Sequence, residues 1–302
     1  MLIVLLLLAI SLSLQPQNIL ARHMRLQIKE AQNDGPAKRG VQSAAMQDSL
    51  PKRAIVIGAS VGMGREVAKL LAADGYIVGM TARRLPLLEA IQKAIPTPTY
   101  IAAMDAAKPH EAVAILNRMI NDMGGLDLLV IAVTGFHDCD WESSDWEDVA
   151  AVLTVDVTGF FALAQTGLNF FEEQGHGHLV GFSSIDGLRG VAAAPAYSAA
   201  KAFCSRYLEA ERNKFAQKQI PIFVTDIVPG WIDSMGNFDH SKVPQAYWVE
   251  TLEDASREIF EAIKNKKPVA YITKRWQMLA ELLPHIPDEL YNALSARAGG
   301  SF

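Results

Sequence analysis

Short apolar segments alternate with amphipathic segments from Arg53 to Ile272, and this alternation restricts the fold more than any other feature of the sequence. The apolar segments are continuous runs, which is typical of strands covered by helices on both faces. Glycine and proline mark the ends of the expected helices, as at 64–75 and 108–125. The alternation predicts a single doubly wound α/β domain with a mostly parallel sheet of about seven strands. The expected strands are 54–58, 76–82, 99–104, 126–133, 178–183, 221–228 and 268–272.

The composition fits a globular protein. Half of the 302 residues are hydrophobic, 20% are charged, and the net charge is -5. A chain of this length can form a continuous core. The acidic balance argues against nucleic acid as a partner, because phosphate binding needs clustered Lys and Arg. The two cysteines, Cys139 and Cys204, have no metal-type spacing, so we expect no metal site and reduced thiols in a reducing compartment, the cytoplasm.

The apolar run MLIVLLLLAISLSL (1–14) allows three interpretations. It is shorter than the ~20 residues of a membrane span and lacks the basic segment that opens a signal peptide. It is a dispensable leader if the domain starts near Met46, just before the first strand. It is a membrane tether with the rest of the chain facing the cytosol if the positive charges after it set the orientation. Export is the third interpretation.

The first expected strand runs into GASVGMGRE, a glycine loop that opens a helix. Glycines let the backbone turn sharply and approach a pyrophosphate, and the helix N-terminus directs its N–H groups at the anion. A loop after the first strand and before a helix is the context that a Rossmann-type dinucleotide site requires. We therefore expect cofactor contacts from Gly58, Ser60, Gly62, Met63 and Gly64.

The end of the second expected strand indicates which dinucleotide is bound. An acidic residue there binds the ribose 2′-OH of NAD, whereas arginine accommodates the 2′-phosphate of NADP. Ala82 stands at the acidic position and Arg83 follows it, which predicts NADP(H) with Arg83 as the main contact. Asp105 and Ala106 follow the third strand, where Asp105 either bonds the adenine or caps the next helix.

Three polar residues suggest acid–base chemistry. Tyr197 and Lys201 are four residues apart, so on a helix they share one face. A nearby cation lowers the pKa of a phenol, and such a tyrosine can exchange a proton with an alcohol or carbonyl oxygen. Ser184 follows the fifth expected strand, at the sheet edge where doubly wound folds bind ligands, and can hydrogen-bond the same oxygen.

Together with the glycine loop, these residues make the chain resemble a short-chain dehydrogenase/reductase over residues ~52 to 275. The resemblance implies a catalytic Ser184, Tyr197 and Lys201, with Tyr197 and Lys201 also holding the cofactor. VPGWIDS (228–234) resembles the family's segment beside the nicotinamide, which implies contacts from Pro229, Gly230 and Ile232, with Ser234 in place of the usual Thr. A homodimer or homotetramer is implied as well.

Composition, periodicity and this resemblance together divide the chain into three parts. Residues 1–50 are the apolar leader and a linker, 51–275 the NAD(P)-binding catalytic domain, and 276–302 a C-terminal helical tail. The tail carries apolar residues at helical spacing, which predicts core packing, a dimer contact or a membrane-surface helix.

Two departures from the family pattern stand out. IAVTG (131–135) replaces the usual Asn-Asn-Ala-Gly after the fourth strand, from which we expect altered local packing. Asp156 stands where the family has its fourth catalytic residue, an Asn whose main-chain carbonyl holds a water leading to the Lys. The carbonyl survives the exchange, but a carboxylate near Lys201 raises the Lys pKa and opposes its effect on Tyr197.

The loops at the carboxyl edge of the expected sheet contain polar and apolar residues that could line a site. GFHDCDWESSDW (135–146) gathers potential metal ligands, but neighbours on one short loop rarely converge on an ion, so we interpret it as a polar rim. Apolar residues in these loops predict a lipophilic pocket; they are Phe136, Ile185, Trp231, Phe238, Tyr247 and Trp248.

These features predict an NADP(H)-dependent oxidoreductase that interconverts a carbonyl and an alcohol on a lipophilic substrate. The alternative is a nucleotide-binding protein of the same fold with poor turnover, a redox-responsive interaction partner. Asp156 and the missing asparagines support that alternative.

Overall fold

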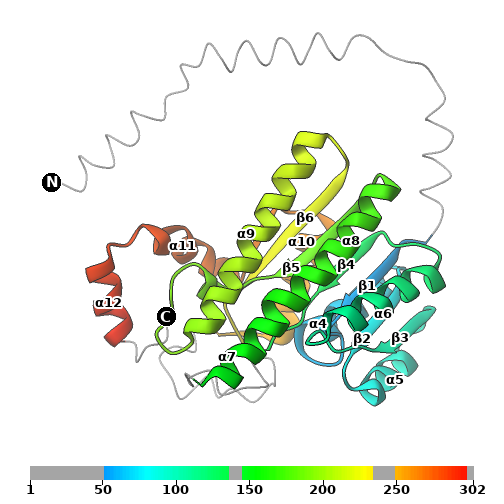
Figure 1. Ribbon diagram of the computed structural model, residues 1–302, viewed down its shortest axis with the longest axis horizontal. Coiled ribbons are helices and arrows are strands. Elements are labelled where there is room, and N and C mark those ends of the chain that lie inside the picture. The colour runs from blue at the N-terminus through cyan, green and yellow to red at the C-terminus, as the bar shows by residue number, and fades with distance from the viewer. Residues whose placement is uncertain (1–50, 136–144, 234–248, 298–302) are drawn as a thin grey trace, which may run out of the picture. The chain divides into compact units, whose positions relative to one another are not determined.

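The computed structural model describes residues 51–135, 145–233 and 249–297. Within these residues seven strands form one sheet in the order β3-β2-β1-β4-β5-β6-β9 (Figure 1). The strands are β1 (Arg53–Ile57), β2 (Ile77–Ala82), β3 (Thr99–Ala103), β4 (Leu128–Ile131), β5 (Gly177–Phe182), β6 (Ile222–Pro229) and β9 (Val269–Ile272). The chain divides into the units Met1–Leu50 and Pro51–Phe302, and the first lies outside the described residues.

All six pairings in this sheet are parallel, which confirms the predicted doubly wound α/β fold. The strand order reverses between β1 and β4, and a crevice at such a switch point is where open α/β sheets bind ligands. Because the strands are parallel, the segments that follow them all leave from the same edge of the sheet, the carboxyl edge. The expected strands match these seven within a few residues at their ends.

Helices cover both faces of the sheet, which explains why its strands are apolar throughout. One face carries α4 (Gly62–Ala73), α5 (Leu85–Ala94) and α10 (Leu252–Lys264). The other carries α6 (Pro109–Met123), α8 (Phe160–Gln174) and α9 (Pro195–Lys218), which lie side by side (Figure 1).

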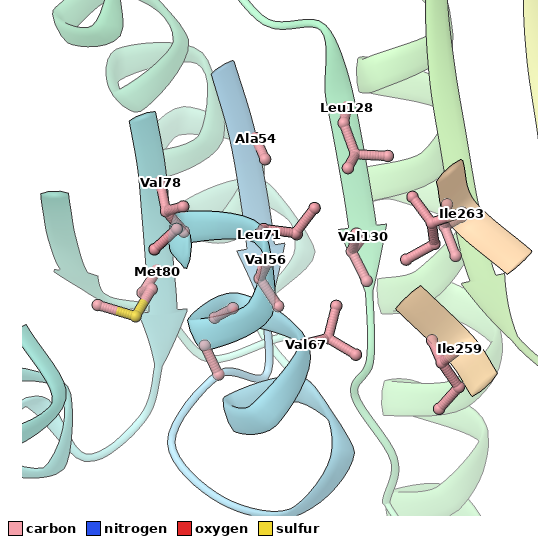
Figure 2. Close-up of a cluster of buried hydrophobic side chains, with 14 of the residues drawn as sticks. Ala54, Val56, Val67, Leu71, Val78, Met80, Leu128, Val130, Ile259 and Ile263 are labelled. Carbon is pink, nitrogen blue, oxygen red and sulfur yellow. The ribbon is translucent and has the colours of Figure 1, made fainter. Parts of the chain in front are cut away.

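Figure 2 shows how the first layer packs. Val67 and Leu71 of α4 face Val56 of β1, while Ile259 and Ile263 of α10 lie toward β4. All five side chains are buried. Each such side chain stabilises the fold by about 1.5–3 kcal/mol, so the glycine loop between β1 and α4 is supported by well-packed elements on both sides.

The remaining elements lie around the carboxyl edge or beyond the sheet. They are α7 (Trp146–Leu153), the π-helix η1 (Thr154–Gly159), the 3-10 turn η2 (Ile185–Gly187), the short parallel pair β7 (Trp231–Asp233) and β8 (Val249–Thr251), α11 (Lys274–Leu282), the 3-10 turn η4 (Leu283–His285) and α12 (Asp288–Arg297). The sequence did not predict the β7–β8 pair or the π-helix.

One continuous helical stretch, Trp146–Gln174, is long and apolar enough to cross a membrane by length and composition alone. Its second half is α8, whose Leu163, Leu168 and Phe171 are buried against the sheet. The same test is passed by core helices of soluble proteins, so it gives little support to a membrane span. The apolar run 1–14 lies outside the described residues.

A titratable side chain is buried within the sheet layer itself. His178 of β5 is 7% exposed, and its Nε2 lies 2.8 Å from Oγ1 of Thr225 on β6. Burial, reinforced by the positive charge of Lys266, lowers the pKa of His178 to about 3. The imidazole is therefore neutral in the folded protein across the physiological range.

His178 should make the fold sensitive to acid. Because its pKa is depressed on folding, the unfolded chain binds an extra proton between pH 6.5 and 3, so stability falls as the pH drops through this window. We expect a loss of about 2 kcal/mol between pH 7 and pH 5. The free energy of unfolding of His178→Gln, measured with urea, should not show this loss between pH 7 and pH 5. An equal loss in the variant would contradict the assignment to His178.

Candidate active site

The glycine loop after β1 makes contacts that only glycine permits. Gly58 has φ +90°, and a Cβ there would lie 2.6 Å from the carbonyl oxygen of Ala132, which follows β4. A Cβ on Gly64 would lie 2.3 Å from the carbonyl oxygen of Gly58. The amides of Gly58 and Ala59 both donate to Thr81 O, at 2.9 and 3.0 Å. The loop is therefore closed tightly against its neighbouring strands.

The outer side of this loop is open and suits a cofactor pyrophosphate. Gly62 opens α4 with φ +59°, and a Cβ there would meet no atom within 4 Å. The residue before it, Val61, supplies no side-chain cap, and the first turn holds no acidic residue. A helix N-terminus with uncapped N–H groups favours a bound anion. Ser60 is partly exposed beside it, whereas Met63 packs against the core, and their cofactor contacts stay predictions.

The second cofactor position is the link between β2 and α5. Arg83 and Arg84 form this link and are exposed, directly after the buried Ala82. No carboxylate is present at this turn in the described chain. A preference for NADP(H) from these residues stays a prediction.

Asp105 lies in the turn after β3 and accepts a hydrogen bond on Oδ1 from the amide of Ala107 at 3.0 Å. The helix α6 begins later, with Lys108 as its N-cap and no side-chain capping bond. The helix-cap interpretation of Asp105 was therefore wrong, because the carboxylate closes its own turn. The neighbouring Ala106 is buried, and its carbonyl oxygen lies 2.2 Å from where a Cβ on Gly159 would be. Adenine contacts by these two residues stay predictions.

Ser184, Tyr197 and Lys201 come together at the carboxyl edge. Pro195 begins α9, and its first two turns present Tyr197 and Lys201, with the Lys Nζ 5.4 Å from the centroid of the Tyr ring. Ser184 follows β5, caps η2 by accepting a hydrogen bond from the Asp186 amide at 3.2 Å, and hydrogen-bonds the phenol of Tyr197. The predicted spacing thus produces the expected grouping.

Asp156 forms a buried ion pair with Lys201. Its Oδ1 lies 2.7 Å from Nζ of Lys201, and the two residues are 1% and 3% exposed. Its Oδ2 accepts hydrogen bonds from the amide of Gly135 at 2.7 Å and the hydroxyl of Thr134 at 3.4 Å. The main-chain carbonyl of Asp156, to which the resemblance assigns a water, accepts a hydrogen bond from Sγ of Cys204 at 3.1 Å.

Sequence reasoning did not assign roles to Thr134, Gly135 and Cys204. The signal available for the first two was the departure from the family's asparagine motif, which was interpreted only as altered packing. No local pattern points to Cys204, because its contact spans 48 positions and depends on the π-helix η1.

The charges around Tyr197 act in opposite directions. Partial burial of the phenol raises its pKa to about 12; Lys201 lowers it, while the Asp156 and Asp186 carboxylates raise it. Burial lowers the pKa of Lys201, but Asp156 and the phenol outweigh burial and raise it above its usual value. Burial also raises the pKa of Asp186 to about 6. Tyr197 is therefore a phenol at neutral pH in the ligand-free protein.

The segment after β6 lies against the C-terminal helices. Pro229 ends the strand, and Gly230 leaves room for Trp276, since a Cβ there would lie 2.1 Å from its Nε1. Ile232 of β7 is partly buried against the core. Their nicotinamide contacts stay predictions, and Ser234 lies outside the described residues.

The predicted apolar pocket is only partly described. Ile185 is buried and Trp231 partly buried, and both pack with Val228 and Trp276. Phe136, Phe238, Tyr247 and Trp248 lie outside the described residues, as does the potential metal cluster of 137–140.

The comparison with known proteins agrees with this geometry. The model of the short chain dehydrogenase family matches residues 52–242, which include the glycine loop, the ion pair and the Ser, Tyr and Lys. The chain belongs to the short-chain dehydrogenase family.

Curated short-chain dehydrogenase relatives extend along most of the chain. An uncharacterized oxidoreductase of Myxococcus xanthus is 31% identical over 255 residues, covering 82% of this chain and 97% of the relative. A hydroxysteroid 11-beta-dehydrogenase 1-like protein of Xenopus laevis is 26% identical, covering 72% and 76%. The protein is thus an oxidoreductase of a family that acts on CH–OH and carbonyl groups.

Solved structures of the family share the fold. A short-chain dehydrogenase from Streptomyces avermitilis superposes with a TM-score of 0.67 at 22% identity, over 84% of this chain and all of that one. A variant of actinorhodin polyketide ketoreductase, solved with NADPH, gives 0.64 at 20% identity, over 74% and 95%.

The ion pair makes a prediction for the pH profile of this short-chain dehydrogenase. Replacing Asp156 by Asn removes a negative charge beside the coupled Lys201 and Tyr197, so the first proton of this pair should leave at lower pH. We expect the alkaline limb of kcat/KM for carbonyl reduction to move down by about one pH unit or more.

The matched control is Asp127→Asn. Asp127 accepts a hydrogen bond from the Arg53 amide at the start of β1, at the opposite edge of the sheet. In this variant the alkaline limb of kcat/KM should lie at the same pH as in the unmodified protein. A limb that is unchanged in Asp156→Asn would mean that only the backbone of residue 156 matters.

Proposed function

We propose that this protein is an NADP(H)-dependent oxidoreductase that interconverts a carbonyl and an alcohol on a lipophilic small molecule. The observation that carries the proposal is the grouping of Ser184, Tyr197 and Lys201 at the same sheet edge as the open glycine loop. A proton-exchanging side chain and a dinucleotide cradle in one place are what direct hydride transfer requires.

The residues would divide the chemistry as follows. The cofactor, held at the glycine loop, supplies or takes up the hydride when bound. Tyr197 donates its phenol proton to the substrate oxygen during reduction and regains it from solvent, so each carbonyl reduced consumes one proton. In oxidation the phenolate accepts the alcohol proton. Ser184 orients the substrate oxygen by hydrogen bonding, and Lys201 supplies the positive charge that stabilises the phenolate.

Arg83 and Arg84 support the preference for NADP(H). They stand exposed at the end of β2, next to an alanine where an NAD-binding site has its carboxylate. The α5 helix that follows has no acidic residue in its first turn. Among the described residues, a 2′-phosphate at this turn would therefore meet arginine, with no carboxylate in the β2–α5 link or the first turn of α5.

A lipophilic substrate is supported by the apolar residues around Ser184. Ile185 follows it directly, Leu188 lies three residues further on, and both belong to an apolar cluster with Trp231 and Trp276. Pockets for small apolar molecules have such walls. A similar Xenopus laevis protein carries a hydroxysteroid dehydrogenase-like name, which fits a substrate of this class.

The Asp156–Lys201 pair favours one second candidate, a cofactor-binding protein with poor turnover. The carboxylate compensates the charge that would otherwise acidify Tyr197. Such a protein would bind NADPH at the same loop and respond to the redox state of its ligand. Turnover measurements separate the two functions.

We further propose that the protein works in the cytoplasm, or tethered through residues 1–14 with the domain facing the cytosol, as a homodimer or homotetramer. Exposed aromatic side chains on α8 and α9 support self-association. Phe161 and Phe203 are 43% and 36% exposed and contact the ring of Tyr207 at 5.3 and 6.1 Å. Light scattering on the purified chain tests the oligomeric state.

Turnover is the decisive test of the function. The full chain, given NADPH and a panel of aromatic, steroid-like and long-chain carbonyls, should consume NADPH with at least one of them. Tyr197→Phe keeps the ring but lacks the proton, so we expect kcat to fall by about 10²–10⁴ with NADPH binding retained. NADPH binding without turnover on any substrate would favour the binding-protein candidate.

Cofactor preference has its own test. Removing a charged hydrogen-bond donor to the 2′-phosphate costs about 1.5–3 kcal/mol, so Arg83→Ala should weaken NADPH binding by about 10–100-fold and leave NADH binding unchanged. Fluorescence titration gives both dissociation constants. Lys93→Ala, which removes an exposed positive charge from the far end of α5, is the control. Tighter binding of NADH than NADPH by the unmodified protein would refute the preference.

A further inference from the structure

A single short segment joins two of the catalytic residues. Residues 185–194, here called the connector, join Ser184, which follows β5, to Pro195 at the start of α9, the helix that presents Tyr197. The hydrogen bond between Ser184 and Tyr197 therefore depends on how the connector is held.

On one side the connector is packed against α9. A Cβ on Gly187 would lie 2.7 Å from the backbone carbon of Lys201 and 2.8 Å from the amide nitrogen of Ala202. Only glycine allows this approach. In the same turn, the Asp186 amide donates to Oγ of Ser184 at 3.2 Å. A shift of the connector would thus move Ser184 relative to Lys201.

On the other side one arginine binds the connector to the C-terminal segment, residues 274–297. Nη1 of Arg189 donates to the carbonyl oxygens of Leu283 and Ile286 at 3.1 and 2.7 Å, and Nη2 bonds the carboxylate of Asp288 at 2.8 Å. Its Cζ lies 4.3 Å from the centroid of the Tyr291 ring, a cation–π contact. The guanidinium thus meets η4, the turn after it and α12 at once.

The C-terminal segment makes two further contacts with the connector. The hydroxyl of Tyr291, itself buried, donates to the carbonyl oxygen of Gly190 at 3.0 Å. Trp276 and Leu279 of α11 belong to the apolar cluster that contains Ile185 and Leu188. The connector therefore contacts α9 on one side and the C-terminal segment on the other, with Gly190 and Ala192 left exposed.

We infer that Arg189 is a positioning residue, through which the C-terminal segment holds the connector so that Ser184 stays in place beside Tyr197. The inference rests on the proposed function only for its kinetic readout. It makes residues 283–291 part of the active-site framework, although they lie about a hundred positions from the catalytic residues in the sequence.

Arginine is required for this role by its shape. Its planar fork reaches several acceptors at fixed angles, whereas the lysine ammonium is a single point on a flexible stem. Arg189→Lys should therefore rescue little. We expect kcat to fall by about 10–100-fold in Arg189→Ala, because small displacements of catalytic groups have effects of this size. The dissociation constant of NADPH should not change, since the glycine loop is untouched.

A double-mutant cycle with Ser184→Ala separates positioning from general destabilisation. If Arg189 acts through Ser184, the double variant should be about as slow as Ser184→Ala alone. If the double variant instead loses kcat by the product of the two single-variant losses, the inference is overturned. The control is Arg257→Ala, an exposed arginine of α10 that pairs only with Glu253 and Asp254 in the described chain. It should leave kcat unchanged.

A second readout does not need turnover. Hydrogen exchange followed by mass spectrometry should show faster exchange of the amides of residues 184–194 in Arg189→Ala and not in Arg257→Ala. Unchanged exchange would overturn the inference. If Arg189→Ala does not fold, Tyr291→Phe removes only the bond to Gly190 and should loosen the same amides. An inactive unmodified protein would count against the proposed function and leave this measurement decisive for Arg189.

Discussion

The buried ion pair between Asp156 and Lys201 is the interaction on which the site depends. Two charges at 1% and 3% exposure are stable only when each is well paired. The carboxylate meets this need with both oxygens, one for Lys201 and one for the amide of Gly135. An asparagine in the same orientation would replace one of these two oxygens by an NH2 group, which donates and cannot accept from Lys201 or from the Gly135 amide. The carboxylate therefore joins η1, α9 and the segment after β4 in a way that the family's usual residue could not.

This contact connects the two departures from the family pattern. The segment that lacks the asparagines after β4 ends in Thr134 and Gly135, and both donate to Asp156. The sequence shows them as separate substitutions 21 positions apart, but in the fold they form one arrangement. The residue at 156 and the segment after β4 thus form one contact, beside which Tyr197 and Lys201 lie together as their spacing predicts.

The ion pair affects the pH range in which Tyr197 can donate a proton, but it cannot change whether carbonyl reduction or alcohol oxidation is favoured at equilibrium. At a given pH the equilibrium constant fixes the ratio of forward to reverse efficiency, whatever the protein does to Tyr197. What Asp156 changes is the pH at which the phenol loses its proton, because it compensates the charge of Lys201. A tyrosine that stays protonated to alkaline pH is an available proton donor throughout the range in which carbonyls are reduced, and a phenolate for oxidation is correspondingly rare.

Local patterns predicted the parts of the site that depend on neighbours in sequence. The glycine loop and the Tyr197–Lys201 spacing are of this kind, and strand alternation predicted the sheet edge that receives them. The remaining contacts join distant segments: Asp156 meets Lys201 across 45 positions, and Arg189 meets Leu283 across 94. No propensity or period encodes such pairs, because they arise only when the sheet order is fixed. In the sequence Arg189 looks like an ordinary loop arginine, and only the fold brings its guanidinium to the carbonyls of Leu283 and Ile286 and the carboxylate of Asp288. Local motifs therefore supply the residue types of the site, whereas contacts between segments far apart in the sequence fix their positions.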